Sequence, residues 1–119
     1  RGDAVAVPHR RQLLGGLAQG LGATLMEQMV YREGQLLTGS LMDYAVPRAT
    51  DMPPVRLISQ PTLSTANPLG FKGVGEAGCI GVPAALVNAV MDALPPDTPD
   101  LSLPLTPEKV WRAIHGLEP

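Results

Sequence analysis

Glycine and proline interrupt this sequence so often that most of the chain cannot lie in long helices or strands. Each of the two residue types occurs thirteen times among the 119 residues. Glycine loses much conformational entropy in regular structure and proline removes a backbone donor, so both favour turns. The composition therefore predicts short regular elements joined by much irregular chain, in one domain at most.

The core of such a chain has few large side chains available to it. Its aromatic residues are Tyr31, Tyr44, Phe71 and Trp111, so most of the core volume must come from aliphatic side chains. Two explanations of this composition stay open. Either the chain packs against other protein, or a genome rich in G and C has enriched it in glycine and alanine.

Charge and cysteine content exclude several classes of function. Lysine and arginine are scattered and the net charge is −2, so no basic surface for nucleic acid or anionic membrane is expected. No apolar run has the length of a membrane-spanning helix, and no signal peptide is visible. Cys79, the single cysteine, excludes an internal disulfide and a cysteine-built metal site. We expect a cytoplasmic protein.

Three segments have the pattern of helices. In residues 11–29, apolar side chains recur every four positions and form one face. The members of this row are Leu13, Leu17, Leu21, Leu25 and Met29. Residues 82–94 form the second predicted helix, with Pro83 in its first turn. The third predicted helix has Thr106 as its N-cap and Gly116 as its C-cap.

Two segments between the first and second helices have the pattern of strands. Residues 36–44 alternate imperfectly between apolar and polar side chains, and residues 55–59 form a short apolar run. Residues 62–78 predict a long loop, which in a compact domain is usually functional or disordered. The sequence therefore predicts an α+β fold, in which a small mixed sheet of two or three strands packs with about three helices.

One face of the first predicted helix carries almost no bulk. The helical neighbours of Gln19 are Gly15, Gly16, Gly22 and Ala23. Each glycine inside a helix costs about 1 kcal/mol relative to alanine, so helix propensity does not explain them. Such a bare face predicts the close approach of a ligand or of another backbone.

The predicted loop carries a second concentration of glycine. Gly73, Gly75 and Gly78 leave the backbone free to adopt positive φ and to approach a ligand closely. A helix begins just after the loop, and its free N–H groups favour anions, so a phosphate-binding loop is one interpretation. The residue order is neither that of a P-loop nor that of a dinucleotide-binding motif. A flexible surface turn is the equally weighted alternative.

Glu76 is the candidate catalytic residue of this loop. It is the only carboxylate between Asp51 and Asp92, in a run that is otherwise apolar and rich in glycine. Apolar surroundings would desolvate the charged carboxylate and raise its pKa, which suits a general base. An exposed loop glutamate is the more common alternative.

Four other polar residues lie in or near these motifs. Lys72 either meets a cofactor phosphate or is solvated, and both interpretations stay open. Asp43 and Arg48 are expected to form a structural ion pair or turn hydrogen bonds, and Cys79 to be a small packed side chain.

Taken together and in this order, these motifs resemble those of one protein family. The sequence resembles the molybdopterin-binding large subunit of xanthine dehydrogenase/aldehyde oxidase-type molybdenum hydroxylases, and within them the carbon monoxide dehydrogenase-like branch. The resemblance extends from Gln12 to Ile114, whereas residues 1–11, where a strand leading into the helix is expected, match poorly. It rests on GGLAQGLG at 15–22, DYAVPR at 43–48, NPLGFKGVGEAG at 67–78, GVPAA at 81–85, NAVMDAL at 88–94 and LTPEKVW at 105–111.

The resemblance implies a role for each candidate site residue. Glu76 would be the catalytic base beside the molybdenum, and Gln19 would contact the pterin cofactor. The backbone of Gly73, Val74 and Gly75 would shape the loop that directs Glu76 to the metal. No residue of this chain is expected to be a metal ligand. Residues 1–119 would form a C-terminal fragment of the larger molybdopterin-binding domain.

The resemblance also implies an activity that this chain shares with other parts of a complex. It implies an oxidoreductase that oxidises an aldehyde, an N-heterocycle or carbon monoxide, with water as the oxygen source. The cofactor would be molybdenum-molybdopterin, in the cytosine dinucleotide form. Iron–sulfur centres and FAD would lie on partner subunits or domains of a hetero-oligomer, together with the remainder of the large subunit. By itself the chain would have no turnover.

Two other functions remain open at this point. The chain can be a truncated, non-catalytic paralogue that acts as an assembly or interaction module. It can also be an anion- or nucleotide-binding module that uses the glycine-rich loop.

Overall fold

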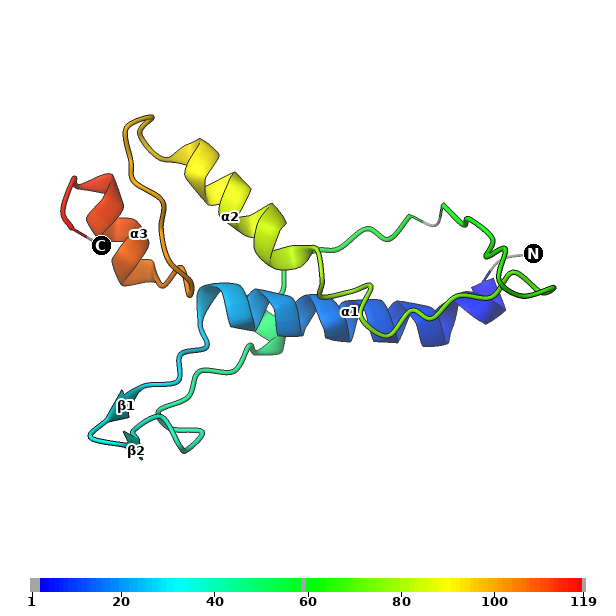
Figure 1. The fold of residues 1–119 in the computed structure, drawn as a ribbon, viewed down its shortest axis with the longest axis horizontal. Helices are drawn as coiled ribbons and strands as arrows, with labels where there is room; N and C mark the ends of the chain where they lie inside the picture. Colours follow the sequence, from blue (N-terminus) through cyan, green and yellow to red (C-terminus); the bar gives the residue numbers. More distant parts are fainter. Residues whose placement is uncertain (1–2, 59, 119) are drawn as a thin grey trace.

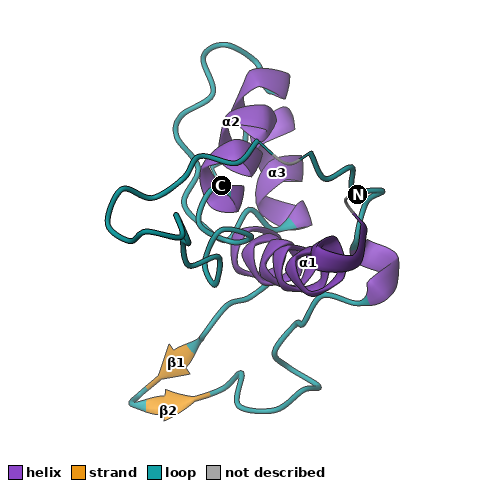
Figure 2. Cartoon of the chain, turned by 90° about the vertical axis from the view of Figure 1, so that its right-hand side faces the viewer, coloured by secondary structure: helices purple, strands orange, loops and turns teal. Residues whose placement is uncertain are grey.

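The structure, a computed structural model, describes residues 3–58 and 60–118. These residues form three α-helices, a two-stranded sheet and one short 3-10 helix. In chain order the elements are α1 (Asp3–Leu25), β1 (Tyr31–Arg32), β2 (Gln35–Leu36), η1 (Ala49–Asp51), α2 (Val82–Ala93) and α3 (Pro107–Ile114). Helix α1 is the longest element, with α2 and α3 on one side of it and the β hairpin on the other (Figure 1, Figure 2).

The α+β fold class is confirmed, but the sheet is smaller and simpler than predicted. Strands β1 and β2 are antiparallel and pair Tyr31 with Leu36, so the sheet is a hairpin and not a mixed sheet. The turn between them places Glu33 and Gly34 at φ values of 50° and 79°. Positive φ is common for glycine and unusual for glutamate.

The predicted strands are wrong for a physical reason that the sequence partly contains. Within residues 36–44, only Leu36 lies in a strand. The Ser40 hydroxyl donates to Asp43 at 2.6 Å and the Tyr44 N–H donates to the Ser40 carbonyl at 2.8 Å, so this segment turns. Residues 55–58 lie in no strand, and Ser59 lies outside the described residues. The predicted loop at 62–78 is confirmed, because it contains no helix or strand.

Helix α1 begins earlier and ends earlier than predicted. It includes residues 3–10, where a strand was expected, because no strand of the described residues lies beside this segment to pair with it. It ends at Leu25, where the N–H groups of Met26 and Glu27 both donate to the Gly22 carbonyl. Two residues after Gly22, the Thr24 carbonyl accepts from the Leu105 N–H at 2.7 Å, which fixes the end of α1 to the distant chain.

The other two helices follow their predictions closely. Helix α2 has proline in its first turn and ends at Ala93. Helix α3 begins after Thr106, whose hydroxyl accepts from the Lys109 N–H at 3.4 Å. Gly116 has a φ of 64°, as expected for the glycine that ends a helix.

The hydrophobic core lies between α2, the connector after it and α3. Its buried members are Leu94, Leu101, Leu105 and Ala113, and Leu25 brings the end of α1 to it. Thr24 is fully buried, and its hydroxyl donates to the Gly20 carbonyl at 2.6 Å. One small core therefore joins all three helices.

Most of the remaining surface is exposed. The accessible surface is 9507 Å², whereas a compact protein of this mass exposes about 6200 Å². The radius of gyration is 18.1 Å, against about 13.5 Å for a compact domain of this length. Of the two explanations of the composition, these values support the first, in which the chain packs against other protein. No helix among residues 3–58 and 60–118 is long and apolar enough to cross a membrane.

The glycines of α1 differ in their surroundings. A Cβ atom at Gly20 would lie 2.7 Å from the Cβ of Val82, the first residue of α2. A Cβ at Gly22 would lie 2.7 Å from the Cγ of Pro47. Near that contact the Tyr44 hydroxyl donates to Glu27 at 2.7 Å, and this hydrogen bond raises the pKa of Tyr44 above 10.0. Gly20 and Gly22 therefore allow other segments to approach the helix backbone.

We predict that replacing Gly20 and Gly15 by alanine has opposite effects on stability. Gly20→Ala should lower the free energy of unfolding by about 1–3 kcal/mol, because its methyl group overlaps Val82. Gly15→Ala should raise it by up to about 1 kcal/mol, because nothing lies within 4 Å of that position and alanine favours the helix. Urea unfolding of the cofactor-free protein measures both. Equal stabilisation by the two variants would show that α1 and α2 do not pack as described.

Candidate functional site

The turn that carries Glu76 lies directly before α2. The loop runs toward the N-terminal end of α1, then returns alongside the helix to Val82 (Figure 1). The Glu76 carbonyl accepts from the N–H groups of Cys79 and Ile80 at 3.0 and 3.1 Å. The Ala77 N–H donates to the Val74 carbonyl at 3.2 Å. Successive turns therefore hold the main chain on both sides of Glu76.

This turn packs directly against the backbone of α1. A Cβ at Gly16 would lie 2.9 Å from the Cα of Gly78, and a Cβ at Gly78 would lie 2.5 Å from the carbonyl oxygen of Leu13. Gly78 is buried by this contact. Neither position has room for a side chain, so the two glycines permit a close backbone approach.

The conformational reason given for the loop glycines is wrong. Gly73, Gly75 and Gly78 do not have positive φ; among the described glycines, only Gly34, Gly70 and Gly116 do. Gly78 is required by its contact with α1. At Gly73 and Gly75 nothing lies within 4 Å of an added Cβ, so packing within the described chain does not require glycine at either position.

Gln12 is a residue of this site that the sequence interpretation missed. Its side-chain amide donates to the Gly75 carbonyl at 3.1 Å. Gln12 and Gln19 lie on the same face of α1, seven residues and about 10 Å apart. The helical periodicity places the two glutamines on one face, but it does not show which segment contacts them.

The face around Gln19 is open, but it is narrower than predicted. Gln19, Gly15 and Ala23 are exposed, and nothing lies within 4 Å of a Cβ at Gly15. Gly16 and Gly22 are instead covered by Gly78 and by Pro47 of the same chain. The open surface is thus a stripe of Gly15, Gln19 and Ala23, and the turn with Glu76 is docked at its end nearer Gln12.

The Glu76 side chain is exposed and makes no hydrogen bond or ion pair with the described residues. Val74 is half-buried and Ala77 is exposed, so these neighbours do not enclose the carboxylate. The apolar enclosure that the sequence suggested is not built by this chain. Residues outside it would have to supply that enclosure.

The other polar residues of the region have structural roles. Lys72 donates to the Thr62 hydroxyl at 2.6 Å, within the loop. Asp43 accepts from Ser40 in a turn, and the Arg48 N–H donates to Asp51 at 2.7 Å, so the expected turn hydrogen bonds form and the ion pair does not. Cys79 is half-buried, with its thiol 3.4 Å from the Glu76 carbonyl oxygen.

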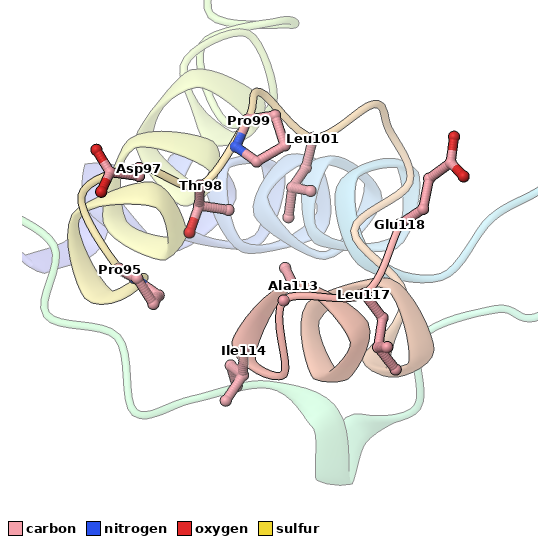
Figure 3. A pocket seen from close by; sticks show the side chains of 10 residues that line it. Pro95, Asp97, Thr98, Pro99, Leu101, Ala113, Ile114, Leu117 and Glu118 are labelled. Atoms are coloured by element: carbon pink, nitrogen blue, oxygen red, sulfur yellow. The ribbon is translucent and has the colours of Figure 1, made fainter.

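Two surface hollows lie elsewhere. One of about 480 Å³ opens between the connector after α2 and the end of α3, where the carboxylates of Asp97 and Glu118 point away from each other (Figure 3). A second, of about 450 Å³, has an apolar lining. It lies between Leu25, Met26, Leu105, Pro107, Val110, Trp111 and Ile114. Neither has converging polar groups, so the exposed stripe and its docked turn are the better candidate. No cluster of three potential metal-ligating side chains occurs in the described part of the chain.

Three comparisons connect these features to known proteins. A family model for the molybdopterin cofactor-binding domain matches residues 9–53, which include both glutamines of α1. The large subunit of nicotine 6-hydroxylase from Paenarthrobacter nicotinovorans is 47% identical over 110 residues, covering 89% of this chain and 13% of that protein.

Solved structures match the fold over a similar extent. Quinoline 2-oxidoreductase from Pseudomonas putida 86 has a TM-score of 0.83 and 41% identity, covering 92% of this chain and 14% of that one. The Cu,Mo-CO dehydrogenase has a TM-score of 0.84 and 28% identity, covering 91% and 14%.

The chain spans about one seventh of the length of these proteins. Within that span both the sequence and the fold are similar to those of the relatives. The chain therefore belongs to the molybdopterin-binding large subunits of the xanthine dehydrogenase/aldehyde oxidase family, of which it corresponds to one segment.

Proposed function

We propose that this chain supplies a catalytic base and one cofactor-facing helix surface to a molybdenum hydroxylase. The observation that carries the proposal is the docking of the Glu76 turn on α1, through Gly16 and Gly78, at the end of the stripe that presents Gln19. The base and the cofactor-facing amide come from segments about sixty residues apart in sequence. Their common position on one open face supports a shared role.

The residues on this face suit a molybdopterin cofactor. The exposed Gln19 amide offers both a donor and an acceptor, as hydrogen bonding to a pterin ring requires. Gly15, Gly73 and Gly75 all have open space where a side chain would stand. A flat ligand can therefore approach the helix and the loop backbone closely.

In this proposal Gln19 and the backbone of Gly73, Val74 and Gly75 hold the cofactor. When bound, the molybdenum centre supplies the two-electron redox chemistry of an oxidation that takes its oxygen from water. Glu76 acts as the base and accepts a proton from the water-derived nucleophile at a carboxylate oxygen. Its side chain makes no bond within the described chain, so it is free for that task.

The remainder of the large subunit would complete the site. It would cover the exposed stripe and exclude water around Glu76, and this would strengthen the electrostatic interactions of the carboxylate. In this proposal residues 1–119 are the C-terminal part of the molybdopterin-binding domain. The chain has no turnover without the rest.

Relatives named as a large subunit and as a subunit of a dehydrogenase complex support a hetero-oligomer. We propose that the cofactor has the cytosine dinucleotide form and that iron–sulfur centres and FAD lie on partner subunits. Two relatives are named for nicotine and for quinoline, which are both N-heterocycles. Among an N-heterocycle, an aldehyde and carbon monoxide, these names favour an N-heterocycle as substrate.

We predict that Glu76→Gln lowers kcat by about 10²- to 10⁴-fold in the complete complex, because the amide cannot accept the proton. Molybdenum and pterin contents should equal those of the wild type, since the side chain is exposed and makes no hydrogen bond or ion pair with the described residues. Steady-state kinetics and metal analysis of the same preparations measure both quantities.

Glu33→Gln is the matched control, because Glu33 lies in the hairpin turn on the opposite side of α1 from α2. It should leave kcat unchanged. Wild-type turnover in Glu76→Gln with full cofactor content would rule out Glu76 as the base and favour a non-catalytic role for this segment.

We predict that Gln19→Ala weakens cofactor binding by about tenfold, the effect of losing a good hydrogen bond, so that the purified complex retains less pterin and molybdenum than the wild type. Gln28→Ala is the control, because Gln28 is also exposed but lies beyond the end of α1. Release of the pterin followed by fluorescence detection measures the content. Equal cofactor contents in the two variants would remove Gln19 from the cofactor site.

A further inference from the structure

The exposed amide of Gln12 makes a hydrogen bond to a backbone group 63 positions away, on the residue next to Glu76. We propose that Gln12 is a positioning residue, which sets the direction of Glu76 by holding the Gly75 carbonyl. This inference rests on the proposed function, in which Glu76 is the base.

The hydrogen bond acts on Glu76 through the peptide plane. The Gly75 carbonyl and the Glu76 N–H belong to one planar peptide unit, from which the Glu76 Cα extends. Gln12 Nε2 lies 3.1 Å from that carbonyl oxygen. Fixing the oxygen therefore fixes the orientation of the plane on the N-terminal side of the base.

Gly75 needs such an anchor more than other residues would. Glycine has the widest choice of backbone conformations, and no atom of the described chain lies within 4 Å of an added Cβ at this position. The turn bond from the Ala77 N–H to the Val74 carbonyl spans Gly75 and Glu76 without bonding the peptide between them. Among the described residues, the Gln12 amide makes the hydrogen bond to the carbonyl of that peptide. On the other side of Glu76, its own carbonyl already accepts from Cys79 and Ile80.

Glu76 is thus held at both of its peptide planes while its carboxylate stays free. The docking of Gly78 on Gly16 brings the turn to α1, one helical turn beyond Gln12. That contact sets the position of the segment, and the Gln12 bond sets the rotation of its peptide. One contact therefore determines where Glu76 lies, and the other determines how its peptide is oriented.

A neutral amide suits this position. A carboxylate in place of Gln12 would repel the carbonyl oxygen that it faces. A cation would attract the Glu76 carboxylate and stabilise its charge, which would make it a weaker base. Glutamine donates a hydrogen bond without adding a charge beside the base.

The test uses Gln12→Met in the complete, cofactor-loaded complex. Methionine keeps the length and helix propensity of glutamine but cannot donate, and the position is exposed, so folding should be unaffected. We expect kcat to fall by about 10- to 100-fold with KM unchanged, as for a misplaced catalytic group. Gln28→Met, with the same change at an exposed position beyond α1, should have no effect.

Two further measurements separate positioning from a general structural role. In the Glu76→Gln background, Gln12→Met should cause no additional loss of kcat, because the residue acts through Glu76. Hydrogen exchange of the backbone amides in residues 74–82 should become about fivefold faster in Gln12→Met, whatever the turnover, because one hydrogen bond of the turn is lost.

Losses that multiply in the double variant would overturn the inference, as would unchanged hydrogen exchange in residues 74–82. Full turnover in Glu76→Gln alone would instead refute the proposed function. Faster exchange in Gln12→Met would then still show that Gln12 holds the turn, so the two failures are distinguishable.

Discussion

The candidate site depends on one contact between two backbones, where Gly16 of α1 meets Gly78 of the turn before α2. A Cβ on either residue would come within 3 Å of main-chain atoms of the other segment. This contact brings the turn with Glu76 onto the helix that presents Gln12 and Gln19. Without it, the loop at 62–78 would have no fixed position relative to the glutamines.

The same principle explains why a long helix tolerates four glycines. Each costs about 1 kcal/mol in helix propensity, and the loss is offset where another segment approaches. Gly16 meets the turn, Gly20 meets Val82 and Gly22 meets Pro47. No described residue comes within 4 Å of a Cβ at Gly15. A contact from outside this segment, such as the proposed cofactor, would explain why glycine occurs there.

Local signals in the sequence predicted some elements and could not predict others. Helix α2 has Pro83 in its first turn, and α3 begins at Pro107 after its N-cap Thr106, so a few neighbouring residues are enough to predict where these helices begin. The prediction of a strand at 36–44 was wrong, because a side-chain hydrogen bond at Ser40 turns the chain and no described strand pairs with residues 37–44. The strand predicted before α1 was wrong for the same reason, because no described strand pairs with residues 3–10.

The site was predictable in its parts but not in its assembly. The glycine-rich loop, Glu76 and the bare helix face were all visible as patterns, and the family resemblance gave them roles. Spacing alone could not show that Gln12 reaches Gly75, because 63 positions separate them. Nor could it separate glycines that pack, such as Gly78, from glycines that face open space, such as Gly75.

The open face of Gly15, Gln19 and Ala23 and the large exposed surface have one explanation, which is that this chain forms one side of a site that other protein completes. A crystal structure of the complete protein with its cofactor bound tests this account most directly. The account predicts that the contact of Gly16 with Gly78 persists, with Gln19 on the pterin and the Glu76 carboxylate facing the molybdenum. A structure in which the turn leaves α1, or in which Glu76 faces solvent, would contradict it.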